Sequence, residues 1–281
     1  MSVERHRILS RVVVHALLVV AAAVSLTPFA WLVCAAFKRG EDLFNSSFLP
    51  SGGLRSLTLA NFTYVFAHQP FLTWIVNSIF LASTATVVVV ALSSLGGFAL
   101  AKYAFRGERA LQMVMLATVL MPSQVLLPGS YELIYQLGWL NSYAAILVPA
   151  SVSVFGMFLF RQAMSGVPDE LLQAARVDGC SEFRLWWDIA LPVVRPMTGA
   201  FTLMSFIANW NAYLWPQIVL QDENKYTLPI GLSNMMSLPE YQTEYGALMA
   251  GTLLSLLPVM LLFFSLQKDF IAGLTSGAVK G

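Results

Sequence analysis

The side chains able to do chemistry are sparse in this sequence, and one stretch gathers many of them. Only 11% of the 281 residues are charged, against roughly 25% in a soluble domain. Residues 169–196, DELLQAARVDGCSEFRLWWDIALPVVRP, are the most polar run of the second half and lie between segments apolar enough for lipid. The sequence therefore places this chemistry on the water side of an integral membrane protein.

Several reaction types are excluded by what the sequence lacks. ATP binding by a phosphate-cradling loop needs G-x-x-x-x-G-K-[ST], and no Gly-Lys pair followed by Ser or Thr occurs. The fifteen acids fall in loops or at the ends of predicted spans, which disfavours ion-coupled transport and intramembrane proteases or metalloenzymes. We expect no enzyme, no catalytic residue, no cofactor and no metal site, and two free thiols at Cys34 and Cys180.

Six apolar segments are long enough to cross a bilayer, which takes about 20 residues. The third is interrupted by Pro122 and Pro128, and such kinks are tolerated where neighbouring helices satisfy the freed backbone groups. The first is longer than the apolar core of a signal peptide, so we expect a retained anchor. The six segments are Val12–Ala36, Phe71–Ala101, Ala110–Leu127, Ser142–Phe160, Met197–Leu220 and Tyr245–Leu266.

The distribution of Lys and Arg predicts the orientation of these segments. With the N-terminus inside, the inner segments hold twelve of the sixteen basic residues and the outer ones four. Both termini and the stretch 169–196 are then cytoplasmic. The two long outer segments, 37–70 and 221–244, suit either a soluble partner or simple solvation.

The stretch itself predicts two short helices that meet at a sharp angle. Pro168 suits a first helical turn, Asp169 and Glu170 favour the positive end of the helix dipole, and Gly179 allows the helix to end. The apolar face of this first helix is predicted from the 3.6-residue period to comprise Val167, Leu171, Ala174, Ala175 and Cys180.

In the second helix, Ser181 is a capping residue and Pro192 is expected to limit the length. Phe183, Trp186, Trp187 and Ala190 predict a broad aromatic side. From the residues alone, this pair of helices suits a protein contact or, equally, an interfacial hairpin with its tryptophans at headgroup level.

The pattern QAARVDG followed by ALPVVRP resembles the cytoplasmic signature of binding-protein-dependent ABC import permeases. The match rests on Ala174, Ala175, Gly179, Leu191 and Pro192, with Asp178 as in many members. Further motifs resemble the carbohydrate-uptake branch: NSIF at 77–80, FRG at 105–107, WNAYLWP at 210–216, YTLPIGL at 226–232 and GLTSGAVKG at 273–281.

This resemblance implies a maltose-type permease of the type I ABC importer fold in the cell inner membrane, with six transmembrane helices and cytoplasmic termini. Residues 1–70 would be the first span and an outer segment, 71–267 the permease core with its coupling loop at 161–196, and 268–281 a cytoplasmic tail. Implied partners are a second permease, two ATPase subunits that bind the ATP, and an extracytoplasmic sugar-binding protein, and no nucleic acid. The residues implied to couple to the ATPase are Gln173, Ala174, Ala175, Asp178, Gly179, Leu191 and Pro192.

One position departs from the family pattern, because Gln173 stands where the signature has Glu. An exposed ion pair is often worth only about 0 to 1 kcal/mol, so we expect coupling to survive. Glu170, one turn earlier, is a candidate substitute for the missing acid.

Polar side chains within the spans are candidates for the substrate path, because a sugar is matched by amides and aromatic faces. The alternative role is hydrogen bonding between helices. The predicted function is sugar import as one half of a pore, with glycerol phosphate or another polyol as the alternative substrate and a membrane scaffold as the alternative class. The candidate path residues are Asn77, Ser78, Asn209, Trp210, Asn211 and Tyr213.

Overall fold

The computed structural model of the chain describes residues 2–39, 42, 43, 45, 48–50, 52–237 and 245–276. Within these ranges every regular element is a helix, which confirms the all-α prediction. The end of the closing GLTSGAVKG motif, residues 277–281, lies outside the described residues.

The chain divides into two compact units, of which the first comprises Met1–Phe71 and Leu232–Leu256. Its longest element, α1 (Ser2–Ala36), presents an apolar window of which no residue is buried in this chain. A helix that is apolar all round and uncovered suits lipid or another chain. Asn61, in α2 (Ala60–His68), donates to the carbonyls of Ala36 and Lys38 at 2.8 and 2.7 Å, and so fixes the end of α1.

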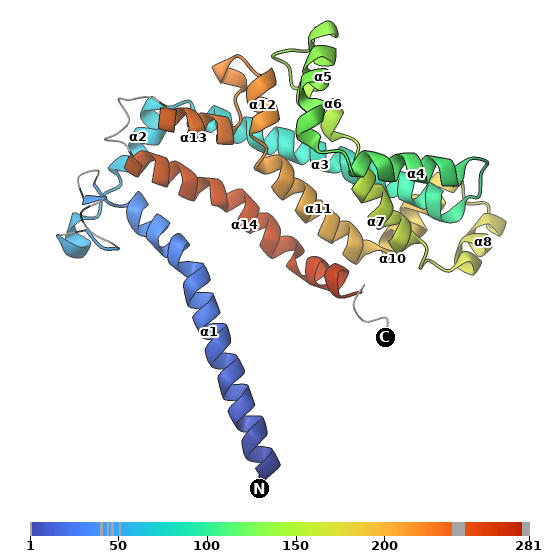
Figure 1. The fold of residues 1–281 in the computed structure, drawn as a ribbon, viewed down its shortest axis with the longest axis horizontal. Helices are drawn as coiled ribbons and strands as arrows, with labels where there is room; N and C mark the ends of the chain where they lie inside the picture. Colours follow the sequence, from blue (N-terminus) through green and yellow to red (C-terminus); the bar gives the residue numbers. More distant parts are fainter. Residues whose placement is uncertain are drawn as a thin grey trace. The chain divides into compact units, whose positions relative to one another are not determined.

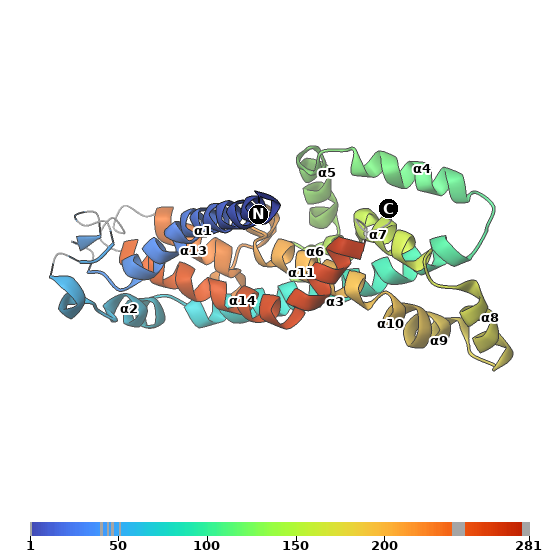
Figure 2. The same cartoon turned by 90° about the horizontal axis from the view of Figure 1, so that it is seen from below.

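The second unit comprises Leu72–Gly231 and Leu257–Gly281 and contains the stretch 169–196. Its longest helix is α3, which runs unbroken from Phe71 to Lys102 (Figure 1). Figures 1 and 2 both place α8, α9 and α10 at one end of this unit, near the last turn of α3. The other elements of the chain are η2 (Gly53–Ser56), α4 (Glu108–Val119), α5 (Ser123–Gln136), α6 (Ala144–Ala150), α7 (Val154–Met164), α8 (Asp169–Val177), α9 (Glu182–Arg184), η3 (Leu185–Ala190), α10 (Leu191–Val193), α11 (Arg195–Trp210), α12 (Leu214–Val219), η4 (Glu223–Lys225), α13 (Leu228–Ser237) and α14 (Tyr245–Ser276).

Four helical segments of the described chain are long and apolar enough to cross a membrane, and the number reaches six if each of two bent pairs is one span. The predicted third span is one of these pairs: α4 and α5 meet at 100° across residues 120–122. Pro122 explains the break, since it lacks an amide hydrogen and disfavours helix at the residue before it.

The other predicted segments differ from the helices mainly at breaks and ends. The fourth consists of α6 and α7, separated at residues 151–153, and the fifth breaks after Trp210 before α12. The sixth continues to Ser276, so residues 268–276 of the predicted tail are helical. These breaks have no strong signal in an apolar sequence, because each flanking piece keeps its hydrophobic character.

Small residues allow α3 and α7 to pack in close contact. A Cβ atom at Gly97 would lie 2.4 Å from Cβ of Phe160 and 2.7 Å from the backbone nitrogen of Arg161. A Cβ atom at Gly156 would lie 2.7 Å from Oγ of Ser93. Two helix backbones can approach this closely only where side chains are absent, so α3 and α7 behave as one packed pair.

Candidate functional site

Lys102, in the last turn of α3, fixes the start of the segment 167–193, which we call the water-side element. Its Nζ lies 2.6 Å from the carbonyl oxygen of Val167 and 2.6 Å from Oδ1 of Asp169. The Lys102 side chain is only 6% exposed, and a charge so far from water needs such partners. Pro168 is extended, with φ −62° and ψ 132°, and α8 begins at the next residue.

The end of α8 is the glycine-terminated motif that the sequence predicts. Gly179 has φ 85°, in the left-handed region that favours glycine. The Gly179 amide donates to the Arg176 carbonyl at 3.0 Å, and the Cys180 amide donates to the Ala175 carbonyl at 2.9 Å. This pair of hydrogen bonds defines a Schellman motif, which reverses the chain sharply before the second helix.

The second helix starts at the predicted cap and ends close to the predicted limit. Ser181 Oγ accepts from the Arg184 amide at 3.4 Å. α9, η3 and α10 form one continuous helix from Glu182 to Val193, which ends one residue after Pro192. Its middle section, Leu185–Ala190, has the wider π-helical turn. At Val194 the chain bends by 87° into α11.

The buried side of the water-side element differs from the predicted faces. On α8 the buried residues are Leu172 and Ala175, whereas Leu171 and Ala174 are exposed. Val167 is buried as predicted, but it precedes α8, which begins at Asp169, and so it does not set the register of the buried face of α8. On the second helix, only part of the predicted aromatic side is covered: Trp186 and Ala190 are buried, while Phe183 and Trp187 are 62% and 55% exposed.

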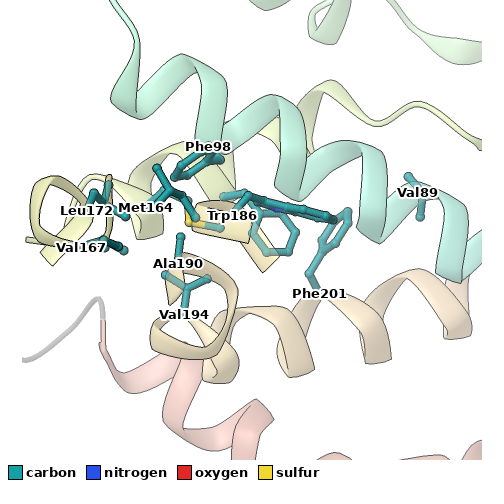
Figure 3. Packing of buried hydrophobic residues seen from close by; sticks show 12 residues of the cluster. Val89, Phe98, Met164, Val167, Leu172, Trp186, Ala190, Val194 and Phe201 are labelled. Carbon is teal, nitrogen blue, oxygen red and sulfur yellow. The ribbon is translucent and has the colours of Figure 1, made fainter. Parts of the chain in front are cut away.

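The buried residues form a cluster that joins the element to the membrane helices. Figure 3 shows Phe98, Met164 and Trp186, from α3, α7 and η3, gathered beside Leu172 of α8. Burying such side chains contributes about 1.5 to 3 kcal/mol each. The element is therefore packed onto α3 and α7 and is not a separate hairpin. The full cluster is Val89, Phe98, Phe160, Met164, Val167, Leu172, Ala175, Leu185, Trp186, Ala190, Val194 and Phe201.

The predicted coupling residues lie on both sides of this packing. Gln173, Ala174, Asp178 and Gly179 are exposed, and a Cβ atom at Gly179 would meet no atom within 4 Å. Ala175 faces the core instead, where its small size admits α8 to the cluster. At the far end of the element, Leu191 is half-buried and Pro192 exposed, directly before the bend into α11.

A clasp of three side chains holds the two helices of the element to the segment after α3. Glu182 accepts two hydrogen bonds from Arg176, from Nε at 2.9 Å and from Nη2 at 3.1 Å. The hydroxyl of Tyr103 donates to the same carboxylate, and the Arg176 guanidinium lies 6.0 Å from the centre of the Tyr103 ring. We call Tyr103, Arg176 and Glu182 the clasp.

The clasp shifts the titration of its members in the directions expected for a paired site. The hydrogen bonds from Arg176 and then Tyr103 lower the pKa of Glu182 to about 2. Partial burial, and then the hydrogen bond to Glu182, raise the pKa of the Tyr103 hydroxyl above its usual value of 10.0. The carboxylate is therefore ionised and the phenol protonated across the physiological range.

Two candidate path residues lie near the start of α3 and bond to backbone. Asn77 Nδ2 donates to the carbonyls of Asn224 and Tyr226 at 2.9 and 3.0 Å, and its Oδ1 accepts from the Tyr143 hydroxyl at 2.8 Å. Ser78 Oγ accepts from the Leu228 amide at 2.7 Å. Both residues thus make hydrogen bonds between elements of the fold. This is the role predicted from the sequence as the alternative to lining the substrate path.

The four remaining path candidates follow one another at the end of α11. Asn209 Nδ2 donates to the Ser205 carbonyl of its own helix at 2.9 Å. Trp210 is buried and stacks on Phe206 with ring centres 5.8 Å apart, whereas Asn211 is exposed. Tyr213 is half-buried in the break before α12. These side chains do not share one lining, since only part of the run faces open space.

Sequence reasoning missed a second polar junction, centred on Asn141. This residue has φ 55°, and its Oδ1 accepts from the amides of Gln221 and Asp222 at 3.2 and 3.1 Å. Lys225 Nζ donates to its carbonyl at 2.7 Å. Asn tolerates the left-handed region better than most residues. Asn141, three residues after Gly138, was therefore the available signal for a turn at this place. The bonds of Lys102 to Val167 and of Tyr103 to Glu182 had no such signal, because their partners lie 65 and 79 positions away.

An open groove of about 500 Å³ lies beside the bend between α10 and α11. Arg195 and Asp269 face each other across it, with Nε and Oδ2 3.6 Å apart. Among the described residues, no group of three or more His, Cys, Asp or Glu side chains is arranged to hold a metal ion.

Comparison with known proteins places this geometry in a family. Residues 93–274 match the model for "binding-protein-dependent transport system inner membrane component". The matched range contains the whole water-side element and the last turns of α3.

Three curated relatives show similarity over most of their length. The chain is 34% identical to the arabinooligosaccharides transport system permease protein AraQ of Halalkalibacterium halodurans, over 92% of this chain and 93% of the relative. It is 34% identical to the lactose transport system permease protein LacG of Rhizobium radiobacter, over 98% of each. It is 35% identical to the sn-glycerol-3-phosphate transport system permease protein UgpE of Salmonella typhi, over 73% of each.

The fold is also found in a solved structure. A chain from a bacterial ABC transporter involved in the import of the acidic polysaccharide alginate superposes with a TM-score of 0.82. The superposition covers 94% of this chain and 97% of the other at 23% sequence identity. The predicted importer-permease fold is thereby confirmed.

Proposed function

The chain belongs to the family of binding-protein-dependent transport system inner membrane components, and on this premise we propose that it is the permease subunit of an ATP-driven sugar importer. It forms half of the translocation pathway and performs no covalent chemistry. The observation that carries the proposal is the water-side element, whose exposed small residues are held over a buried core shared with α3 and α7.

The exposed part of α8 is the proposed contact for a separate ATPase. Gln173, Ala174, Asp178 and Gly179 are exposed together there, and the absence of side-chain bulk at two of them lets another backbone approach. Ala175 serves the inner packing of α8. Leu191 and Pro192 connect the element to α11 just before the 87° bend.

Coupling follows from this arrangement, because the element and the membrane helices share one core. When the ATPase subunits close on ATP, α8 moves with them, and the packed helices move with α8. The pathway then alternates between inward-open and outward-open states, whose populations nucleotide binding shifts.

In the proposed topology the chain lies in the cell inner membrane and crosses it six times. Both termini are cytoplasmic. Four long helical segments and the bent pair of α4 and α5 support five crossings, and α11, which follows the bend after the water-side element, is the proposed sixth. The excess of Lys and Arg on the segments assigned inside, twelve against four, supports the orientation.

The proposed sugar path runs past the end of α11 and the start of α3. Asn211 offers an exposed amide and Tyr213 a half-buried aromatic face, both suited to hydroxyl-rich substrates. Asn209 and Trp210 support that turn, while Asn77 and Ser78 position the segment 224–228 beside it. Proposed partners are a second permease, two ATPase subunits and an extracytoplasmic sugar-binding protein.

The proposal is tested by uptake into proteoliposomes that hold this chain together with its native permease, ATPase and binding-protein neighbours. Radiolabelled arabinooligosaccharides and lactose are the probes. The expected result is accumulation that requires ATP and the binding protein. Accumulation without ATP, or none of either sugar, would contradict it.

A second candidate substrate is glycerol 3-phosphate, favoured by the similarity to UgpE. A phosphoester path calls for basic side chains inside the spans, and the six predicted segments contain no Lys or Arg. The same vesicles supplied with labelled glycerol 3-phosphate separate the two candidates.

A further inference from the structure

The contacts at the two ends of α3 point to a role for this helix as well as for α8. We infer that α3 is a strut that carries the movement of the water-side element to the segment 224–228, with Glu182 as the positioning residue at the moving end. The inference rests on the proposed function, since it describes how that function is transmitted.

At the water side, two contacts bind the end of α3 to different points of the element, and a third binds it to α7. Lys102 holds the start of α8 through Val167 and Asp169. Tyr103 reaches the start of α9 through Glu182. Arg161 Nε, at the end of α7, donates to the Leu100 carbonyl at 3.3 Å. A displacement of the element is therefore resisted by α3 from more than one direction.

Glu182 is the member that ties both helices of the element to α3. Its carboxylate accepts from Arg176, which is on α8, and from Tyr103, which follows α3, while Glu182 itself begins α9. The bidentate bond to Arg176 fixes the orientation of the carboxylate as well as its distance. Without Glu182, α8 and α9 would keep the Schellman turn but lose their side-chain link to Tyr103.

Between its ends α3 is suited to act as a rigid body. It is one unbroken helix of 32 residues, and from Asn77 to Lys102 it spans about 37 Å at 1.5 Å per residue. Its close packing on α7 at Gly97 and Gly156 leaves no space in which the two helices could slide freely.

Near its start, α3 is hydrogen-bonded to the segment 224–228. Asn77 bonds the carbonyls of Asn224 and Tyr226, and Ser78 bonds the amide of Leu228. All of these partners are backbone groups, so the segment 224–228 follows α3 regardless of its own side chains. Asn141 holds the same region through Lys225. Movement of α3 would therefore reposition the turn that follows α12.

The test measures whether the element and the start of α3 move together. Spin labels are placed on Val177→Cys, 87% exposed on α8, and Val76→Cys, 62% exposed near the start of α3, with Cys34 and Cys180 replaced by alanine. The complete complex with its ATPase is studied in lipid nanodiscs, nucleotide-free and trapped with ATP and vanadate. The label-to-label distance distribution is expected to be the same in both states.

The clasp variant Glu182→Gln combined with Tyr103→Phe should make that distribution differ between the two states. Asp188→Asn is the matched control, since it removes an exposed carboxylate six residues later on the same helix. It should behave like the unmutated chain.

A distance change in the unmutated complex would overturn the inference, as would invariance that survives the clasp variant. Failure of the proposed function gives a different result, because no ATPase subunit would be recovered with the chain and no ATP hydrolysis measured. With ATPase present, the expected effect of the clasp variant on ATP-driven uptake is a loss of about fivefold or more, the lower end of typical coupling factors.

Discussion

At the water side the clasp joins the end of α3 to the element through charged side chains close to solvent, whereas near its start α3 is held by neutral side chains that are buried. Arg176 and Glu182 have side chains 38% and 54% exposed. Asn77 and Ser78 are 8% and 3% exposed. A bond between exposed charges can adjust without a large desolvation cost, whereas a buried amide cannot leave its partners cheaply. This difference suits a helix whose water-side end receives the movement and whose start passes it on to the segment 224–228.

The largest effect is expected at the water side, from Gly179→Trp. The substitution strains a residue at φ 85° and adds bulk to the proposed ATPase contact. We expect loss of the ATPase from the complex on size-exclusion chromatography, with the permease still folded. Gly138→Trp is the matched control, because Gly138 has φ 68° and ends α5 with the same pair of backbone hydrogen bonds. If both variants lose the ATPase, strain and not the contact is responsible.

The second-largest effect is expected near the start of α3, from Asn77→Leu. The change leaves two carbonyls and the Tyr143 hydroxyl without their partner. A buried group left unsatisfied costs about 1 to 3 kcal/mol, so a lower Tm is expected, measured by thermal unfolding in detergent. Ile79→Ala, at an exposed position of the same helix, is the control. An unchanged Tm for Asn77→Leu would show that the two ends do not differ as described.

Salt and pH sharpen the comparison further. High ionic strength should weaken the clasp and leave the buried bonds unaffected, because screening acts on exposed charges. Glu182 has its pKa lowered to about 2, so its contribution to stability is present above its usual pKa and is lost as pH falls towards 2. Between about pH 5 and 8 we therefore expect no change from this group. Spin-label mobility at Val177 across salt and pH series checks both statements.

The smallest effect is expected from Gln173→Glu, which restores the acid of the family signature. Gln173 is exposed, and an exposed ion pair contributes about 0 to 1 kcal/mol. We expect ATP-driven uptake to rise slightly or stay constant, and Glu170→Gln to lower it slightly. If uptake is insensitive to both changes, neither residue is the ATPase contact.

Local features of the site were predictable from the sequence, and long-range ones were not. The glycine at 179, the cap at Ser181 and the apolar spans follow from residue chemistry and periodicity. The clasp did not, because Tyr103 and Glu182 are 79 positions apart and neither is unusual by itself. The exposed Leu171 and buried Leu172 show that a short amphipathic helix leaves its register uncertain by one residue. The bend at residues 120–122 had a signal in Pro122, whereas the breaks at residues 151–153 and after Trp210 were hidden by the apolar character of both sides.

The most direct test of the central claim is affinity purification of the unmutated chain, tagged and expressed with its native neighbours, in mild detergent. The account predicts recovery of an ATPase subunit and a second permease, identified by mass spectrometry, together with vanadate-sensitive ATP hydrolysis. A stable, folded chain recovered alone at every salt concentration would contradict it and would favour a scaffold role.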